Sequence, residues 1–167
     1  FKIRHAAKWL KALPKGEGGL VWIHNEEIGL WVTEVLREEG LDVLYCPAGA
    51  NDKIKDKGNW NRIVVASIKA HGTGKNLQHH WNQIVLQWPR QAKLAEQMIA
   101  RTHREGQKKD EVVVTSCHTL AFDHANYSAC LNDALYIHQT GGGRQRIVYG
   151  RHEPLPKIYT PEWLKQH

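Results

Sequence analysis

The strongest constraint on the fold is a strand–helix–strand unit near the start of the chain. Residues 19–24 and 41–46 are short apolar runs of the kind that form buried strands. Between them, residues 26–40 carry apolar side chains at positions i, i+3, i+4, i+7 and i+8, which predicts an amphipathic helix. Because the connections are short, we expect a βαβ unit, in which a right-handed crossover links two parallel strands.

The same alternation continues along the chain. Further strands are predicted over residues 62–67, 83–86 and 111–115, and further helices over residues 3–13, 92–102 and 125–139. We therefore predict an α/β fold with a doubly wound, mostly parallel sheet and helices on both faces. The whole of 1–167 is expected to be one domain with a core over about 20–150, followed by a C-terminal tail over 151–167 that holds three of the six prolines.

Composition excludes several classes of protein. With 41% hydrophobic and 24% charged residues, the chain has an ordinary globular composition, and no window approaches the ~20 continuous apolar residues of a membrane span. Three cysteines without tight spacing argue against a disulfide framework and favour a reducing compartment, so a cytoplasmic location is expected. The only methionine is Met98 and the chain opens at Phe1, so we expect a piece of a longer protein.

A glycine-containing segment, SIKAHGTGKNL, follows the predicted strand 62–67 directly. Glycines at a strand exit let backbone N–H groups approach a phosphate or a neighbouring chain. A P-loop interpretation of the Gly74–Lys75 pair fails, because that pattern needs glycine where Lys69 stands and Ser or Thr where Asn76 stands. Taken alone, the segment fits a structural turn at least as well as a phosphate site.

A second polar segment, QMIARTHREGQ, begins at Gln97. On a continuous helix Gln97, Arg101 and Arg104 would share one face, and two guanidinium groups there would form a charged fork for phosphate oxygens. A solvated face on which these arginines pair with Glu96 or Glu105 explains the spacing equally well. Ligands of doubly wound sheets bind beyond the carboxyl ends of the strands, and we expect both polar segments to lie there.

Together, in this order, the two segments resemble motifs V and VI of the superfamily 2 helicases, most closely those of the Swi/Snf branch. That branch has an S-T-R-A-G-G-x-G-x-N-L block, a W-P stretch and then Q-x-x-x-R-x-H-R-x-G-Q. Trp88-Pro89 stands between the two segments here, LVWIHNEE looks like motif IV, and YCPAG looks like the glycine-containing segment that follows it. The resemblance covers about 20–115 and implies the C-terminal RecA-like domain of a helicase or translocase.

The resemblance also implies roles for particular residues. In the family, ATP lies between two RecA-like domains, and the N-terminal one carries the P-loop and the acidic residues that hold Mg²⁺. Arg104 would then be the arginine finger on the γ-phosphate and Arg101 a second phosphate or interdomain contact, while Gly74, Asn76 and Gln97 would bind ATP. The N-terminal RecA-like domain is the implied partner and is missing from this chain, so we expect no ATP hydrolysis by these residues alone.

DNA is the second partner that the resemblance implies. Contacts to the sugar–phosphate backbone, made without reading sequence, would come from His24, Asn25, Gly49, Ser67 and Lys69. For each of these residues the alternative is a polar group that caps a loop at a strand end. A net charge of +6 is compatible with a polyanionic partner but does not establish one.

Three features depart from the family pattern. Ile68 stands where the family has a hydroxyl side chain, His71 stands in place of the first glycine of the pair, and the connection over 89–97 is longer than in chromatin remodellers. These departures favour a bacterial or phage relative over a eukaryotic remodeller.

Two other interpretations start from the histidines, cysteines and tryptophans. Four potential zinc ligands cluster in the sequence (Cys117, His118, His124 and Cys130), but they lack the paired spacing of zinc sites, and no metal site is predicted. Trp22 and Trp31 are expected in the core, whereas Trp60 and Trp81 are the better candidates for stacking on single-stranded nucleic acid. The alternative functions are therefore a non-enzymatic nucleic-acid-binding module and a protein-interaction module on a RecA-like fold.

Overall fold

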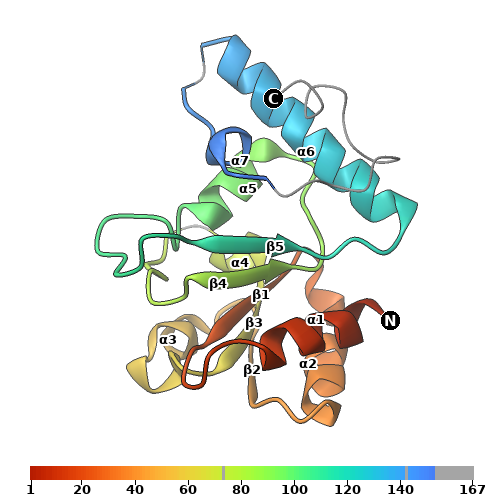
Figure 1. Ribbon diagram of the computed structural model, residues 1–167, viewed down its shortest axis with the longest axis vertical. Helices are drawn as coiled ribbons and strands as arrows, with labels where there is room; N and C mark the ends of the chain where they lie inside the picture. Colours follow the sequence, from red (N-terminus) through yellow and green to blue (C-terminus); the bar gives the residue numbers. More distant parts are fainter. Residues whose placement is uncertain (73, 142, 153–167) are drawn as a thin grey trace.

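The computed structural model describes residues 1–72, 74–141 and 143–152; the predicted tail lies outside this part of the chain except for its first two residues. Five parallel strands form one sheet in the order β2-β3-β1-β4-β5 (Figure 1). The strands are β1 (Gly19–Ile23), β2 (Val43–Cys46), β3 (Ile63–Ser67), β4 (Asn82–Val85) and β5 (Val113–Ser116). The predicted parallel α/β sheet is confirmed.

Helices cover both faces of this sheet. They are α1 (Lys2–Lys11), α2 (Gly29–Glu38), α3 (Asn51–Lys55), α4 (Ile68–His71), α5 (Ala92–Ile99), α6 (Ala121–Gln139) and α7 (Arg146–Tyr149), with 3-10 turns η1 (Glu26–Ile28) and η2 (Lys57–Asn59). Helices α1 and α2 pack on one face, and α3 to α7 lie on the other (Figure 1). No helix in the described ranges is long and apolar enough to cross a membrane.

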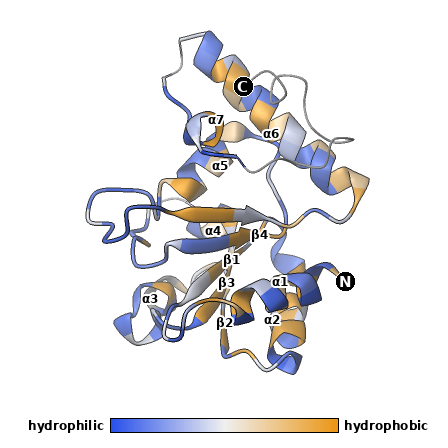
Figure 2. Cartoon of the chain, viewed as in Figure 1, coloured by the Kyte–Doolittle hydropathy of each residue, from blue (hydrophilic) through white to orange (hydrophobic). Residues whose placement is uncertain are grey.

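The strand register explains why the central strands read as continuous apolar runs. Val21 in β1 stands opposite Val65 in β3 and Ile84 in β4, and all three side chains belong to the core under α1 and α2. The next residue along, Trp22, belongs to the core on the other face. Since neighbouring side chains of a strand point to opposite faces, the strands β1, β3 and β4, which are covered on both faces, are buried at every position. Hydrophilic residues concentrate instead in the loops that lead into β4 and β5 (Figure 2).

Helix α2 differs from its predicted form in one respect that matters below. The expected burial of Trp31 is wrong, because this side chain is 58% exposed while Val32 and Leu36 are buried. Helix α2 lies so close to Tyr45 that a Cβ built on Gly29 would stand 2.4 Å from the tyrosine ring. This close approach turns the Gly29 side of the helix inward and leaves Trp31 at the surface.

Candidate nucleotide and nucleic-acid site

The turn after α5 carries both candidate arginines. The prediction of a helix that continues past residue 99 is wrong, because α5 ends at Ile99 and irregular turns follow. The amide of Arg101 donates to the carbonyl of Met98 (3.1 Å) and that of Thr102 to the carbonyl of Ile99 (3.2 Å). Each of these bonds runs from an amide to the carbonyl three residues earlier, as in a 3-10 turn, and such bonds commonly tighten the last turn of a helix. Arg101 and Arg104 therefore project from a turn rather than from a helical ridge.

A buried chain of hydrogen bonds fixes this turn to the sheet. Trp22 Nε1 donates to Gln83 Oε1 (2.7 Å), and Gln83 Nε2 donates to Thr102 Oγ1 (2.7 Å). All three residues have no exposed surface. Because leaving a buried polar group unpaired is costly, the chain stabilises the position of Thr102, which lies between the two arginines in sequence. Sequence reasoning missed this support, since Gln83 and Thr102 carry no local signal that they pair.

The arginine turn lies at the amino-terminal edge of the sheet. Helix α5 returns the chain from the end of β4 to the start of β5, so the turn stands beside segments that precede strands. Lys109 Nζ is 3.2 Å from Glu17 Oε1, just before β1, and a Cβ on Gly106 would lie 2.9 Å from Gln78 Nε2, before β4. The expectation that both polar segments lie beyond the carboxyl ends of the strands is therefore wrong for this one.

Arg101 joins the turn to the glycine-containing loop. Its Nε donates to the carbonyl of Gln97 (3.0 Å), and its Nη1 donates to the carbonyl of Lys75 (3.4 Å). The amide of Leu77 returns a bond to the carbonyl of Arg101 (2.9 Å). Burial, with the neighbouring charge of Arg104, lowers the pKa of the Arg101 guanidinium from its high ordinary value. Two segments far apart in sequence thus form one polar surface.

Arg104 is exposed, and its Nη1 donates to Asn76 Oδ1. A guanidinium has five N–H donors, so most of those on Arg104 are available to a ligand. Gly74, two residues before Asn76, has φ +70°, a conformation that favours glycine, and a Cβ there would meet no heavy atom within 4 Å. Four of the five predicted nucleotide-side residues therefore lie in two adjacent turns, and the fifth, Gln97, lies near the end of α5.

His71 and Lys75 connect the glycine-containing loop to the end of β2. The His71 imidazole is fully buried, and its Nε2 lies 2.9 Å from the carbonyl oxygens of both Cys46 and Pro47. Its Nδ1 contacts Lys75 Nζ, which also donates to the carbonyl of Ala70 (3.0 Å). Burial lowers the pKa of His71 and of Lys75, which favours the neutral imidazole. Because carbonyl oxygens only accept hydrogen bonds, the two carbonyls at Nε2 favour the tautomer with its proton on that nitrogen. His71 thus serves as a bridge where the family has glycine.

The five candidate DNA contacts lie at the opposite, carboxyl-terminal edge. His24 and Asn25 follow β1, Gly49 lies in the turn after β2, Ser67 ends β3, and Lys69 lies in α4. Parallel strands bring their carboxyl ends to one edge of a sheet, so the fold brings these residues to one side of the molecule.

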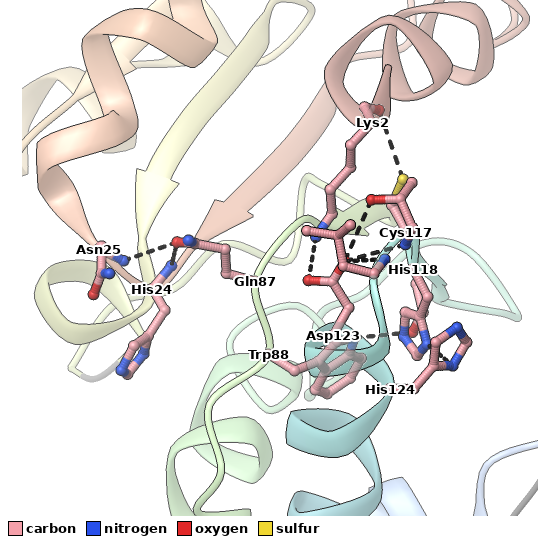
Figure 3. Close-up of polar contacts among 12 residues, drawn as sticks. Lys2, His24, Asn25, Gln87, Trp88, Cys117, His118, Asp123 and His124 are labelled. Carbon is pink, nitrogen blue, oxygen red and sulfur yellow. Dashed lines mark hydrogen bonds and ion pairs between the residues drawn. The ribbon is translucent and has the colours of Figure 1, made fainter. Parts of the chain in front are cut away.

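The first two of these candidates are held by a single side chain. The backbone amides of His24 and Asn25 both donate to Gln87 Oε1, at 3.1 Å and 3.0 Å (Figure 3). Gln87 follows β4, so this contact fixes the loop after β1 against the loop after β4. Burial, followed by the nearby charge of Lys69, lowers the pKa of the His24 imidazole.

The remaining three candidates differ in accessibility. Lys69 and Gly49 are exposed, and Gly49 has φ +85°. Ser67 is fully buried, and its hydroxyl has no hydrogen-bond partner among the described residues. The roles of all five residues in binding DNA stay predictions.

The alternative sites are occupied by internal contacts. Within the described ranges, no group of three or more His, Cys, Asp or Glu side chains is arranged to hold a metal ion. Trp60 stacks on His79 with ring centroids 4.3 Å apart. Trp81 donates to Glu17 Oε2 (3.0 Å). Both tryptophans lie before strands, at the edge opposite the candidate DNA contacts.

Comparison with solved structures places this geometry in a known fold. The chain is similar to the C-terminal part of the Fun30 ATPase domain, with a TM-score of 0.65 and 26% sequence identity over 77% of this chain. It is also similar to the E. coli DEAD-box protein SrmB, crystallised with the regulator of ribonuclease activity A, with a TM-score of 0.55 and 19% identity over 78% of this chain and 77% of that one. The fold is that of a superfamily 2 C-terminal RecA-like domain.

This RecA-like domain spans 44% of the Fun30 chain that it matches. No protein-family model matches the sequence, and no curated protein matches it significantly. The fold therefore agrees with the family resemblance of the two polar segments. The roles of the individual site residues are supported only by the geometry described above.

Proposed function

We propose that this RecA-like domain is the second motor domain of an ATP-dependent DNA helicase or translocase. In this proposal it completes an ATPase site whose other half lies on a separate, N-terminal RecA-like domain. The observation that carries the proposal is the convergence of Arg101 and Arg104 with the loop over Lys75 and Asn76. A solvated charged face would not require two distant segments to meet in this way.

The chemistry follows from the arginine turn. ATP, with Mg²⁺ held by the partner domain, supplies the phosphoryl group that is transferred to water. Arg104 projects at the surface with most of its donors available, where it would donate to oxygens of the γ-phosphate as negative charge develops on them. A cation placed in this way is worth ~10³–10⁵ in rate in related phosphoryl-transfer systems. Asn76 orients the Arg104 guanidinium, and Gln97 and Lys75 hold Arg101 through their carbonyl groups.

DNA would bind at the opposite edge of the sheet. Lys69 supplies an exposed charge for a phosphate, while the loop of His24 and Asn25 is held in place by Gln87. Contacts of this kind fix a strand without reading its sequence. The His71–Lys75 bridge supports communication between the edges, because it ties the turn after β2 to the loop that contacts Arg101.

Two substitutions in the protein that carries both domains test the proposal. Arg104→Ala is expected to lower kcat for DNA-stimulated ATP hydrolysis ~10³-fold or more and to leave the Kd for DNA unchanged. Lys69→Ala is expected to weaken DNA binding and to reduce the salt slope of binding by about 1, with kcat preserved at saturating DNA. Arg90→Ala, at an exposed arginine that precedes α5, is the matched control and should change neither quantity.

Two results would contradict the proposal. If Arg104→Ala weakened ATP hydrolysis and DNA binding equally, the arginine would be supporting the fold rather than the reaction. ATP hydrolysis by the 167 residues alone would show that no second domain is needed.

A further inference from the structure

A cavity lies at the point where the strand order of the sheet reverses. From β1 the chain continues to β2 and β3 on one side, and from β4 it continues to β5 on the other. In open α/β sheets, the crevice outside the carboxyl ends at such a point is the usual place for a ligand. A cavity of about 200 Å³ occupies this place, next to Leu86 and Gln87 at the end of β4.

Aromatic side chains from two different helices flank the cavity. Trp31 projects from the first turn of α2 and is 58% exposed, and Phe122 projects from the first turn of α6 and is 52% exposed. Ile28 and Val32 add to the apolar wall. Large apolar side chains that gather at the surface around a cavity indicate a binding site, because their burial by a ligand is favourable.

The charged groups at the cavity neutralise each other. Lys2 Nζ lies 2.6 Å from Asp123 Oδ1, an ion pair that links α1 to α6 (Figure 3). Both residues line the cavity. Asp123 Oδ2 also accepts the amides of Thr119 and Leu120, so this carboxylate is engaged on both oxygens. An occupant of the cavity would therefore be uncharged at the buried end, with flat apolar faces that match the two rings.

Gln87 provides both a polar contact and a connection to the candidate DNA edge. Its Oε1 accepts the amides of His24 and Asn25, while its Nε2 has no hydrogen bond to the rest of the described chain. The same side chain lines the cavity. Gln87 therefore joins the loop of His24 and Asn25 to the cavity that Trp31 and Phe122 flank.

We propose that this cavity receives an unpaired nucleobase of a bound single strand. The base stacks on Trp31 and Phe122, and its polar edge accepts a hydrogen bond from Gln87 Nε2. A nucleobase suits the site because its faces are apolar and uncharged while its edge is polar, and stacking tolerates any base. This inference rests on the proposed nucleic-acid binding and adds to it a preference for single strands over duplexes, in which the bases are paired and stacked.

Binding of a fluorescent single-stranded oligonucleotide by the 167-residue chain, followed by anisotropy, tests the proposal. Trp31→Ala and, separately, Phe122→Ala are expected to raise Kd roughly 5- to 150-fold, the range found for loss of one stacked base, with an unchanged salt slope. Leu30→Ala is the matched control, because Leu30 is 63% exposed on the same helix but does not line the cavity. An oligonucleotide of abasic sites should bind wild type and Trp31→Ala equally.

The outcomes separate this inference from the proposed function. Binding with an ordinary salt slope that neither aromatic substitution weakens would overturn the inference and leave the proposed function intact. Failure of the wild-type chain to bind any nucleic acid at low salt would overturn both. If the two aromatic substitutions weakened duplex binding as much as single-strand binding, the single-strand preference would be overturned. If a free mononucleotide competed at the same concentration as the oligonucleotide, the cavity would take nucleotides instead. If the cavity bound an apolar peptide and no oligonucleotide, it would be a protein-docking site, and the proposal would be overturned.

Discussion

His80 makes the stability of this RecA-like domain depend on pH. Its imidazole is 1% exposed, and neither ring nitrogen has a hydrogen-bond partner within the described chain. Burial, followed by the neighbouring charge of His79, lowers the pKa of His80 from 6.5 to about 3. The folded state therefore keeps the imidazole neutral under conditions in which the unfolded chain is protonated.

The sign and size of the effect follow from these two pKa values. Above pH 6.5 the imidazole is neutral in both states, and the stability is fully present. As the pH falls from 6.5 toward 3, the unfolded chain binds a proton that the folded state does not, so unfolding becomes more favourable. At pH 5, about 2 kcal/mol of the free energy of unfolding is lost through this one group.

Urea unfolding at about pH 7.5 and pH 5, followed by circular dichroism, measures this loss. The decrease in the free energy of unfolding between the two pH values should be ~2 kcal/mol smaller in His80→Leu than in the wild type. His5→Gln, at an exposed position on α1, should leave the decrease unchanged. If His80→Leu showed the same decrease as the wild type, His80 would be charged in the folded state and the reasoning would be refuted.

Two further substitutions test the packing, with urea unfolding as the measurement. Gly18→Ala places a Cβ 2.2 Å from the backbone oxygen of Trp60, so we expect it to lower the free energy of unfolding by about 3 kcal/mol. Gly58→Ala is the control: its Cβ would have its nearest heavy atom at 3.6 Å, and it should change the free energy of unfolding by less than about 1 kcal/mol. Asp123→Ala removes the ion pair with Lys2 and the acceptor of two amides before α6, and should cost about 2–3 kcal/mol. A loss below about 0.5 kcal/mol for Asp123→Ala would mean that water replaces these bonds.

The sheet was predictable because both of its faces are covered. Strands such as β1 and β3 are buried at every position, so they stand out as unbroken apolar runs between turns. Helix α2 and most of its buried side were predictable from the periodicity, but the exposure of Trp31 was not. The exposure of Trp31 depends on how closely Gly29 approaches Tyr45, a contact between residues that are distant in sequence.

The candidate site residues come from the sequence and stay predictions, whereas their geometry could not be predicted. The resemblance to helicase motifs identified Arg101, Arg104 and Asn76 as candidates, and the structure brings them into neighbouring turns. Helical spacing wrongly extended α5 through the arginines. The turn that follows the helix is held by Thr102, whose buried hydroxyl pairs with Gln83 in β4, and no local pattern reveals a contact between residues so far apart in sequence.

The position of the arginine turn shows the same limit. The rule that ligands bind beyond the carboxyl ends of strands describes sites that one domain builds by itself. In the proposed function the arginine turn contributes to a site on another domain, for which it need only be exposed, as Arg104 is at the amino-terminal edge. The buried His71–Lys75 bridge was also missed, because histidine at a family glycine position looked like an obstruction rather than a link.

The central claim is that this chain supplies Arg104 to a nucleotide held on a different domain. The most direct test adds the purified chain to the separately expressed N-terminal RecA-like domain of the same protein and measures single-turnover ATP hydrolysis in the presence of DNA. We predict that the wild-type chain accelerates hydrolysis in a saturable manner and that Arg104→Ala binds the domain equally well without accelerating it. Equal acceleration by both chains would contradict the claim.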